Sequence, residues 1–331
     1  MASLAGHGPN IGHTWVKYVI IGSDGRELPP VCFPSVIASA GRQVAGTLVN
    51  APVAMVAGQG RFWTGLDAQL SGNQISIMSQ DRLSDPCYLP ALFAGALGRM
   101  GHLNGNARGV FVSGLPANQA LDATLCQALA ARLRAAAAAD QIAKLKIIGE
   151  PLGLAYGYIL DNNGQLIRPE LASARLGIVD LGGRTVDLAE LLRLALVDGS
   201  YRTFDLGAAR PLGELATQLS ARADRDLTVL DADLAVRDRS LKIGKTVTPL
   251  PRGWDRPFVA NGEAVVRRID SVWGRGTQFD AILVGGGGAE LEPVAAQITR
   301  AYPNAIIVDR PQLAIATGYA RLARRIAASL R

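Results

Sequence analysis

Residues 180–187 read Asp180-Leu181-Gly182-Gly183-Arg184-Thr185-Val186-Asp187, and they separate two runs with the composition of buried strands. The pattern predicts a strand that carries Asp180 into a tight turn, where two glycines let the backbone approach an anion. The Thr185 hydroxyl follows the turn, and the Asp180 carboxylate can hold the hydrated Mg²⁺ that accompanies a nucleotide. A plain β-hairpin is the alternative, and Asp187 suits a structural hydrogen bond as well as a catalytic role.

A second glycine-rich segment follows another apolar run: Ile282-Leu283-Val284-Gly285-Gly286-Gly287-Gly288-Ala289-Glu290. The order predicts a buried strand, a glycine loop and a helix. Glycine is needed where backbone lies against a ligand, and a helix N-terminus favours negative charge. The segment lacks the lysine of a P-loop and the spacing of a dinucleotide fingerprint. We interpret its four glycines as ligand contacts, with a structural turn as the alternative.

The first half of the chain contains two weaker features. Asn10-Ile11-Gly12-His13-Thr14-Trp15-Val16-Lys17 is a possible second phosphate-facing hairpin, although the residues before it, 4–9, make a poor strand. The pair Glu150-Pro151 ends an expected strand over Lys144–Ile148, so the Glu150 carboxylate can face a cleft. A solvated loop position is the alternative for this glutamate.

Short β-branched runs alternate with helical stretches along the chain, which predicts an α/β fold. Each half opens with a strand, a turn and a second strand, and later contains a buried strand, so the sequence has a weak internal repeat. The turn Asp161–Gly164 is the expected break between the halves. We expect single helices over Ala117–Asp140 and Ala289–Tyr302, and a final helix over Pro311–Leu330 that packs against the first half.

The composition restricts the class of partner. The 331 residues are 49% hydrophobic and 19% charged, which suits two domains with a sizeable core. Aromatic residues make up only 5%, which argues against a nucleic-acid reader built on stacking. The net charge of +6 is spread along the chain, so we expect no direct specific binding of nucleic acid.

The N-terminal sequence lacks the basic and apolar regions of a secretory signal, and no apolar run approaches about 18 residues. The three cysteines, Cys32, Cys87 and Cys126, have no metal-ligand spacing. They are expected to be small buried residues in a reducing compartment. We therefore expect a cytoplasmic protein without membrane binding.

Taken in order, these four motifs resemble the superfamily of actin, heat-shock chaperone and sugar-kinase ATPases. Within it, the chain is similar to the plasmid-partitioning ParM/StbA branch. The residues that carry this second likeness are Val16-Lys17-Tyr18-Val19, Phe33-Pro34-Ser35, Gly114-Leu115-Pro116 and Pro311-Gln312 before Gly318. The resemblance implies an α/β, actin-like (ribonuclease H-like) fold of duplicated lobes, with mixed sheets flanked by helices and a nucleotide cleft between them. The first lobe would comprise residues 1–165 plus 309–331, and the second residues 166–308.

The resemblance also implies the roles of the site residues. Mg²⁺ with ATP or ADP, or with GTP, would lie between the lobes, its phosphates held by Asn10, Gly12, His13, Thr14 and Lys17 and by Gly182, Gly183, Arg184 and Thr185. Asp180, with Asn10, would hold the Mg²⁺ shell, and Glu150 would position the attacking water. Gly285, Gly286, Gly287 and Gly288 would lie along the adenosine. The implied function is nucleotide-dependent, slow and assembly-stimulated hydrolysis in filaments that segregate plasmid DNA through a DNA-binding adaptor protein.

One departure leaves alternatives open. The family has aspartate where this chain has Asn10, which keeps an acceptor but lacks the charge that helps to bind Mg²⁺. Either hydrolysis is impaired, or another group compensates, or the N-terminal segment is atypical. A non-catalytic adaptor at the membrane and a small-molecule kinase of the same superfamily are the alternative functions, the former favoured by Asn10 and the basic terminal helix.

Overall fold

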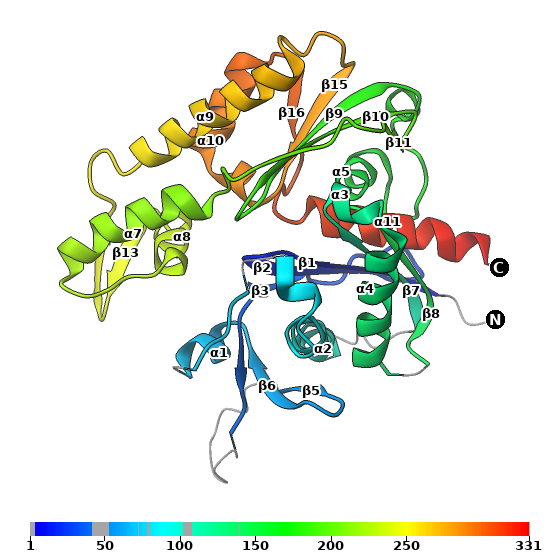
Figure 1. The fold of residues 1–331 in the computed structure, drawn as a ribbon, viewed down its shortest axis with the longest axis horizontal. Helices are drawn as coiled ribbons and strands as arrows, with labels where there is room; N and C mark the ends of the chain where they lie inside the picture. The colour runs from blue at the N-terminus through cyan, green and yellow to red at the C-terminus, as the bar shows by residue number, and fades with distance from the viewer. Residues whose placement is uncertain are drawn as a thin grey trace.

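Two mixed β-sheets organise the chain in this computed structural model, which describes residues 4–41, 53–71, 73–77, 80–101, 108–138 and 140–330 (Figure 1). The first sheet has the strand order β3-β2-β1-β7-β8. Strands β1, β2 and β3 pair antiparallel, whereas β1, β7 and β8 pair parallel. Their bounds are β1 (Ala5–Ile11), β2 (Trp15–Ile21), β3 (Val31–Pro34), β7 (Gly109–Leu115) and β8 (Ile142–Gly149).

The second sheet repeats this plan with the order β11-β10-β9-β15-β16, and β12 also pairs with β10. It too begins with an antiparallel hairpin, β9–β10, whose first strand pairs parallel with a later strand, β15. The bounds are β9 (Arg175–Leu181), β10 (Val186–Leu192), β11 (Ala195–Leu196), β12 (Arg202–Phe204), β15 (Ala281–Gly285) and β16 (Ala305–Ile307). The duplicated α/β plan expected from the sequence is therefore confirmed.

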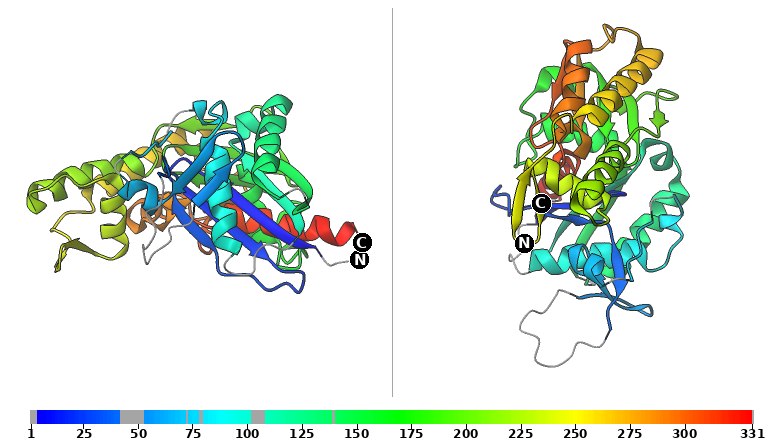
Figure 2. Two further views of the ribbon diagram at one scale, coloured as in Figure 1. Left: turned by 90° about the horizontal axis from the view of Figure 1, so that it is seen from below. Right: turned by 90° about the vertical axis from the view of Figure 1, so that its left-hand side faces the viewer.

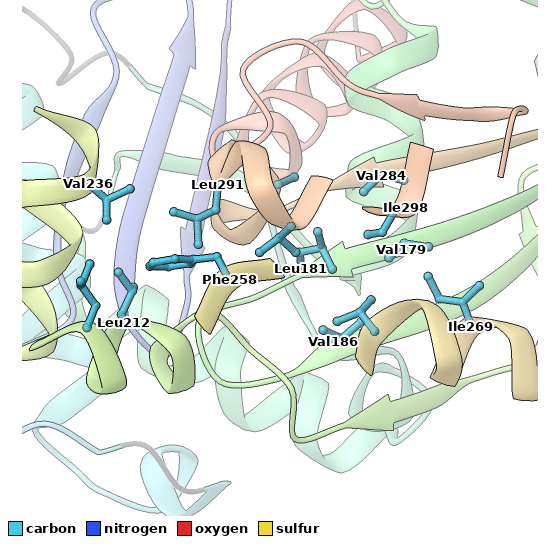
Figure 3. Packing of buried hydrophobic residues seen from close by; sticks show 14 of the residues in the cluster. Val179, Leu181, Val186, Leu212, Val236, Phe258, Ile269, Val284, Leu291 and Ile298 are labelled. Carbon is cyan, nitrogen blue, oxygen red and sulfur yellow. The ribbon is translucent and has the colours of Figure 1, made fainter. Parts of the chain in front are cut away.

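Helices cover both sheets and separate them. Helices α2 (Tyr88–Gly101) and α4 (Ala123–Ala136) pack on the outer face of the first sheet, and α9 (Arg256–Trp273) and α10 (Glu292–Ala301) on the outer face of the second. Figure 3 shows the second of these outer cores, a single cluster that includes Phe258 and Ile269 of α9 and Val179 of the sheet. Helices α5 (Glu150–Ile159) and α11 (Ala314–Ser329) lie between the sheets in a third core with residues from both. This third core therefore joins the two sheets.

Helices α5 and α11 cross at glycines. A Cβ atom on Gly318 would lie 1.8 Å from the carbonyl oxygen of Gly153, and one on Gly157 would lie 2.4 Å from that of Ala314. Backbone therefore meets backbone at this crossing. The arginines of α11 also bind within the chain, because Arg324 donates to Ser23 O at 2.9 Å and Arg325 to Gly164 O at 3.0 Å.

Smaller elements extend from each sheet. On the first sheet they are β4 (Ile37–Ser39), β5 (Val53–Val56), β6 (Gly60–Thr64), α1 (Leu66–Leu70), the 3₁₀ turn η1 (Gln80–Leu83) and α3 (Ala117–Ala120). On the second they are α6 (Pro169–Ala172), α7 (Ala209–Ala223), α8 (Val229–Arg237), β13 (Ser240–Ile243), β14 (Thr246–Pro249) and the 3₁₀ turn η2 (Gly287–Glu290). Figure 1 and the left view of Figure 2 show α7, α8 and the β13–β14 hairpin at the extremity of the molecule opposite the C-terminus.

The expectation that the residues before Asn10 make a poor strand was wrong. Residues Ala5–Ile11 form the central strand β1 and are all buried. Gly8 admits α11, because a Cβ atom there would lie 2.1 Å from the carbonyl oxygen of Ala316. His7 stacks on a neighbouring ring and shares a 2.8 Å hydrogen bond with the hydroxyl of Tyr18. Tertiary packing therefore overrides the weak strand propensity of glycine and proline.

Both expected long helices are divided. The Asp122 carboxylate accepts hydrogen bonds from the backbone N–H groups of Thr124 and Leu125, so α4 begins there instead of continuing α3. The 3₁₀ turn η2 begins at Gly287 and covers the start of the other expected helix, and α10 begins only at Glu292 with a proline in its first turn. The expected burial of the cysteines was also wrong, since Cys32 is exposed and the other two are half-buried. No helix in the described ranges has the length and apolar character needed to cross a membrane.

Candidate functional site

Two hairpin turns, one from each sheet, meet across the cleft. The β1–β2 turn is closed by Gly12 N–H donating to Trp15 O at 3.1 Å, and the β9–β10 turn by Gly182 N–H donating to Thr185 O at 2.9 Å. A Cβ atom on Gly183 would lie 2.1 Å from the Thr14 hydroxyl, so the turns are in contact and this position requires glycine. The two sequence motifs are therefore equivalent structures that face each other.

A cavity of about 50 Å³ lies beneath these turns. It is lined by thirteen of the residues singled out in the sequence, namely Asn10, Gly12, His13, Thr14, Lys17, Glu150, Asp180, Gly182, Gly183, Arg184, Thr185, Gly286 and Gly287. Gly288 lines the adjoining larger cavity. Gly285 lines neither, because it ends β15 where a Cβ atom would lie 2.0 Å from the side chain of Leu154.

The glycine loop closes against the carboxylate of the other motif. Gly286 has a φ of 86°, a conformation that glycine adopts without strain. A Cβ atom there would lie 2.3 Å from Asp180 Oδ1. The pairing of Gly285 with Asp180 in adjacent parallel strands produces this proximity.

Three acidic residues line the small cavity, namely Asp180, Glu150 and Asp187. Burial, followed by the nearby charges of Glu150 and Asp187, raises the pKa of Asp180 from 3.8 to about 8, and Lys17 opposes the shift. Burial also raises the pKa of Glu150, against the opposing charges of Arg82 and Lys17. The carboxyls are therefore placed where a cation would relieve an unfavourable concentration of negative charge.

Polar contacts connect the first hairpin to Glu150. The amide Nδ2 of Asn10 donates to Glu150 Oε1 at 3.1 Å, and Lys17 Nζ donates to Asn10 Oδ1 at 3.4 Å. Arg82, in η1, is 5% exposed and donates from Nη1 to Ile11 O at 2.8 Å. Sequence reasoning missed Arg82, because nothing near it in the sequence distinguishes this arginine from the others.

His13 lies at the turn of the first hairpin without a partner for one ring nitrogen. Its Nε2 is buried and makes no hydrogen bond with the described residues. Burial and the charges of Arg82, Arg184 and Lys17 lower the pKa of His13 to about 3, so the ring is neutral. A buried ring nitrogen of this kind is what a cavity built for a polar ligand would leave unpaired.

The Asp187 carboxylate is surrounded by hydroxyl groups that donate hydrogen bonds to it. It accepts hydrogen bonds from the hydroxyls of Thr185 at 2.8 Å, Tyr201 at 2.6 Å and Thr203 at 2.6 Å. Of the two roles left open for this residue, the structure favours the hydrogen-bonded one.

The small cavity adjoins one of about 360 Å³ that extends between the outer elements of the two sheets. Thr14, Lys17, Gly183, Gly287 and Gln312 line both. The volume is in the range of small-molecule sites.

Trp15 links the two walls of the larger cavity. Its indole N–H donates to the Asp233 carboxylate of α8, and the Arg237 guanidinium lies 5.9 Å from the ring centre. Arg237 also binds Asp233 at 3.1 Å and Glu290 at 2.5 Å. Trp15 was not among the site residues expected from the sequence, although it stands inside the first hairpin motif.

The donor set fits magnesium bound together with phosphates. No group of three histidine, cysteine or acidic side chains suited to a metal occurs in the described part of the chain. Mg²⁺ in nucleotide sites is usually held by one or two carboxylates, phosphate oxygens and several waters. The Asp180 carboxyl satisfies that requirement.

The fold of the chain is similar to that of known structures. The archaeal actin homolog Ta0583 superposes with a TM-score of 0.70 over 98% of this chain and 100% of its own, at 17% identity. The chain has an actin-like fold of the ParM type. The apo pSK41 ParM protein shares this actin-like fold with a TM-score of 0.71 over 99% of both chains, at 16% identity.

A 15-stranded ParM filament from Clostridium botulinum contains the same fold, with a TM-score of 0.67 over 98% of this chain and 100% of its own, at 14% identity. Ta0583 has also been solved in complex with ADP, with a TM-score of 0.67 over 98% of this chain and 100% of its own, at 16% identity. No family model and no curated protein sequence matches this chain.

Proposed function

We propose that this protein is a nucleotide-dependent, filament-forming actin-like ATPase. The observation that carries the proposal is the meeting of two equivalent glycine hairpins, one from each sheet, over the Asp180 and Glu150 carboxyls. Backbone N–H groups in such turns bind anions. A ligand with several phosphates would therefore contact both halves of the molecule at once.

Each half contributes separate groups to this proposed site. The turns at Gly12–Thr14 and Gly182–Thr185, with Lys17, would bind phosphate oxygens, and Gly287 and Gly288 would lie along the adenosine in the larger cavity. Mg²⁺ would neutralise phosphate charge, as phosphoryl transfer requires. Asp180 would hold water molecules of its shell. Glu150, when ionised, would orient the attacking water and accept its hydrogen bond.

The proposed assembly follows from the same geometry. A ligand bound by both hairpins favours one angle between the halves and so shifts the population of conformations. We propose that residues 1–165 with 309–331 form one lobe and residues 166–308 the other. We further propose that nucleotide binding drives self-assembly, and that the filaments segregate plasmid DNA through a DNA-binding adaptor. Two of the structural relatives support this proposal, since Ta0583 binds ADP and the Clostridium botulinum ParM forms a filament. The proposal includes a cytoplasmic localisation.

The membrane-adaptor alternative relied on a basic terminal helix. In the structure, Arg321, Arg324 and Arg325 donate to acceptors of their own chain. These side chains are therefore engaged in packing the helix.

High-speed pelleting with electron microscopy tests the proposal, using protein alone, with Mg-ATP, with Mg-GTP and with a non-hydrolysable analogue. We expect filaments only with nucleotide, and their disassembly over time where the nucleotide can be hydrolysed. Asp180→Asn should abolish the effect of nucleotide, whereas the exposed Asp226→Asn should not. Nucleotide binding without polymer under any of these conditions would refute the filament proposal.

A further inference from the structure

Asn10 occupies a position where its two polar atoms face opposite charges. It is 3% exposed, near the end of β1, and Lys17 is its direct partner in the hairpin register. Its Nδ2 lies 3.1 Å from Glu150 Oε1, and its Oδ1 lies 3.4 Å from Lys17 Nζ. The side chain therefore bridges a cation of its own hairpin and a carboxylate 140 residues away in the sequence.

Chemistry fixes the orientation of this amide. An ammonium group only donates hydrogen bonds and an ionised carboxylate only accepts them. The reversed amide would place its NH₂ group against Lys17 and its oxygen against Glu150, and both contacts would be repulsive. The Asn10 oxygen is consequently directed at an ammonium ion, which is a poor environment for an oxygen that helps to hold a divalent cation.

We propose that Asn10 is a positioning residue, whose amide donates to the Glu150 carboxylate and holds it toward the cavity, and that it is not part of the metal shell. This inference rests on the proposed function, in which Glu150 orients the attacking water. The resemblance implied a metal role for position 10. The contacts instead make asparagine the residue that this arrangement requires.

An aspartate at position 10 would disturb the cluster. It would bring a carboxylate to about hydrogen-bond distance from Glu150, and two like charges so close cannot both ionise at neutral pH. The charged and titratable groups that face Glu150 are Arg82, Lys17, Asp180, Asp187, Tyr201 and Tyr319. Arg82 and Lys17 favour its ionised form, the nearby acids oppose it, and the Asn10 hydrogen bond also lowers its pKa.

The first test needs no turnover. Urea unfolding midpoints of the nucleotide-free protein are compared at pH 6 and pH 8 for Asn10→Asp, Glu150→Gln and the double variant. We expect Asn10→Asp to lower the midpoint, more at pH 8 than at pH 6. The double variant should recover at least about half of that loss, because the exchange rebuilds the same hydrogen bond with donor and acceptor reversed. A single variant as stable as the wild type at pH 8, or no recovery in the double variant, would overturn the proposal.

The second test reads the role of Glu150 in hydrolysis from the pH dependence of kcat. We expect Asn10→Asp to move the acidic limb upward by about one pH unit and to lower kcat at pH 7 by up to about tenfold. Nucleotide Kd should change by less than about threefold, since phosphate contacts come from the turns. Asn10→Ala should move the limb in the same direction but less, and the exposed Asn118→Asp is the control for added charge.

The outcomes separate this inference from the proposed function. Faster hydrolysis by Asn10→Asp, with tighter dependence on Mg²⁺ and an unchanged pH profile, would assign position 10 to the metal shell and overturn the positioning role. A wild type that binds nucleotide without hydrolysing it would refute the ATPase, while the unfolding midpoints would still decide whether Asn10 holds Glu150.

Discussion

Asp180→Asn should stabilise the nucleotide-free protein and make it insensitive to Mg²⁺. The pKa of Asp180 is 3.8 in its ordinary state and about 8 in the folded cavity. The folded state thus retains a proton between about pH 4 and pH 8 that the unfolded chain has released, so stability falls as pH rises through this window. At about 1.4 kcal/mol for each pH unit, the ionised carboxylate opposes folding at pH 8 by at most about 6 kcal/mol.

Asparagine removes that titration while keeping the shape of the side chain. We expect a gain of about 2 kcal/mol in the free energy of unfolding at pH 8, because water entering the cleft and movement of Lys17 relieve part of the cost in the wild type. The gain should shrink as pH falls and vanish below about pH 3, where both states of the wild type hold the proton.

Urea titrations at pH 4.5, 6 and 8 measure this difference, with Asp226→Asn as the control for loss of an exposed carboxylate. Added Mg-ATP should stabilise the wild type by mass action and stabilise Asp180→Asn much less. A variant no more stable than the wild type at pH 8, or a difference independent of pH, would refute the reasoning.

Three further predictions concern the frame around the site. Gly318→Ala should lower the urea midpoint severely or prevent folding, because the new Cβ atom would lie 1.8 Å from a carbonyl oxygen of α5. The control is Gly98→Ala in α2, where a Cβ atom would meet nothing within 4 Å, and it should be neutral or stabilising by up to about 1 kcal/mol. Trp15→Phe removes the hydrogen bond to Asp233 across the larger cavity, so nucleotide Kd measured by calorimetry should rise about threefold to tenfold; an unchanged Kd would show that this bond does not favour the binding conformation. Asp122→Ala should lower the free energy of unfolding by about 1 kcal/mol through loss of the α4 cap, and a change within about 0.3 kcal/mol would contradict that role.

The glycine motifs were predictable because their function requires local backbone geometry. A strand that ends in Asp180 and two glycines has few structural uses, and the order of the motifs along the chain indicated the duplicated fold. The strand β1 was not predictable from residues 4–9, since its stability comes from burial beneath α11 and not from its own propensity.

The electrostatic surroundings of the site could not be predicted from the sequence either. Arg82 comes from a short turn and reaches Ile11 across 71 residues, and Arg237 meets Trp15 across more than two hundred. Such contacts depend on how separate elements are placed in three dimensions. The role of Asn10 could not be predicted for the same reason, because Glu150, to which its amide donates, lies on another element.

The glycine crossing of α5 and α11 has a mechanical consequence. Helices usually resist rolling over one another because side-chain ridges interlock with grooves. Here Gly318 meets Gly153 backbone on backbone, which brings the two helices closer together than interlocking side chains would allow. Both helices belong to the proposed first lobe, residues 1–165 with 309–331, so the crossing holds the C-terminal helix against α5 of the same lobe. The C-terminal segment is thereby held in the first lobe, although residues 166–308 lie between the two helices in the sequence.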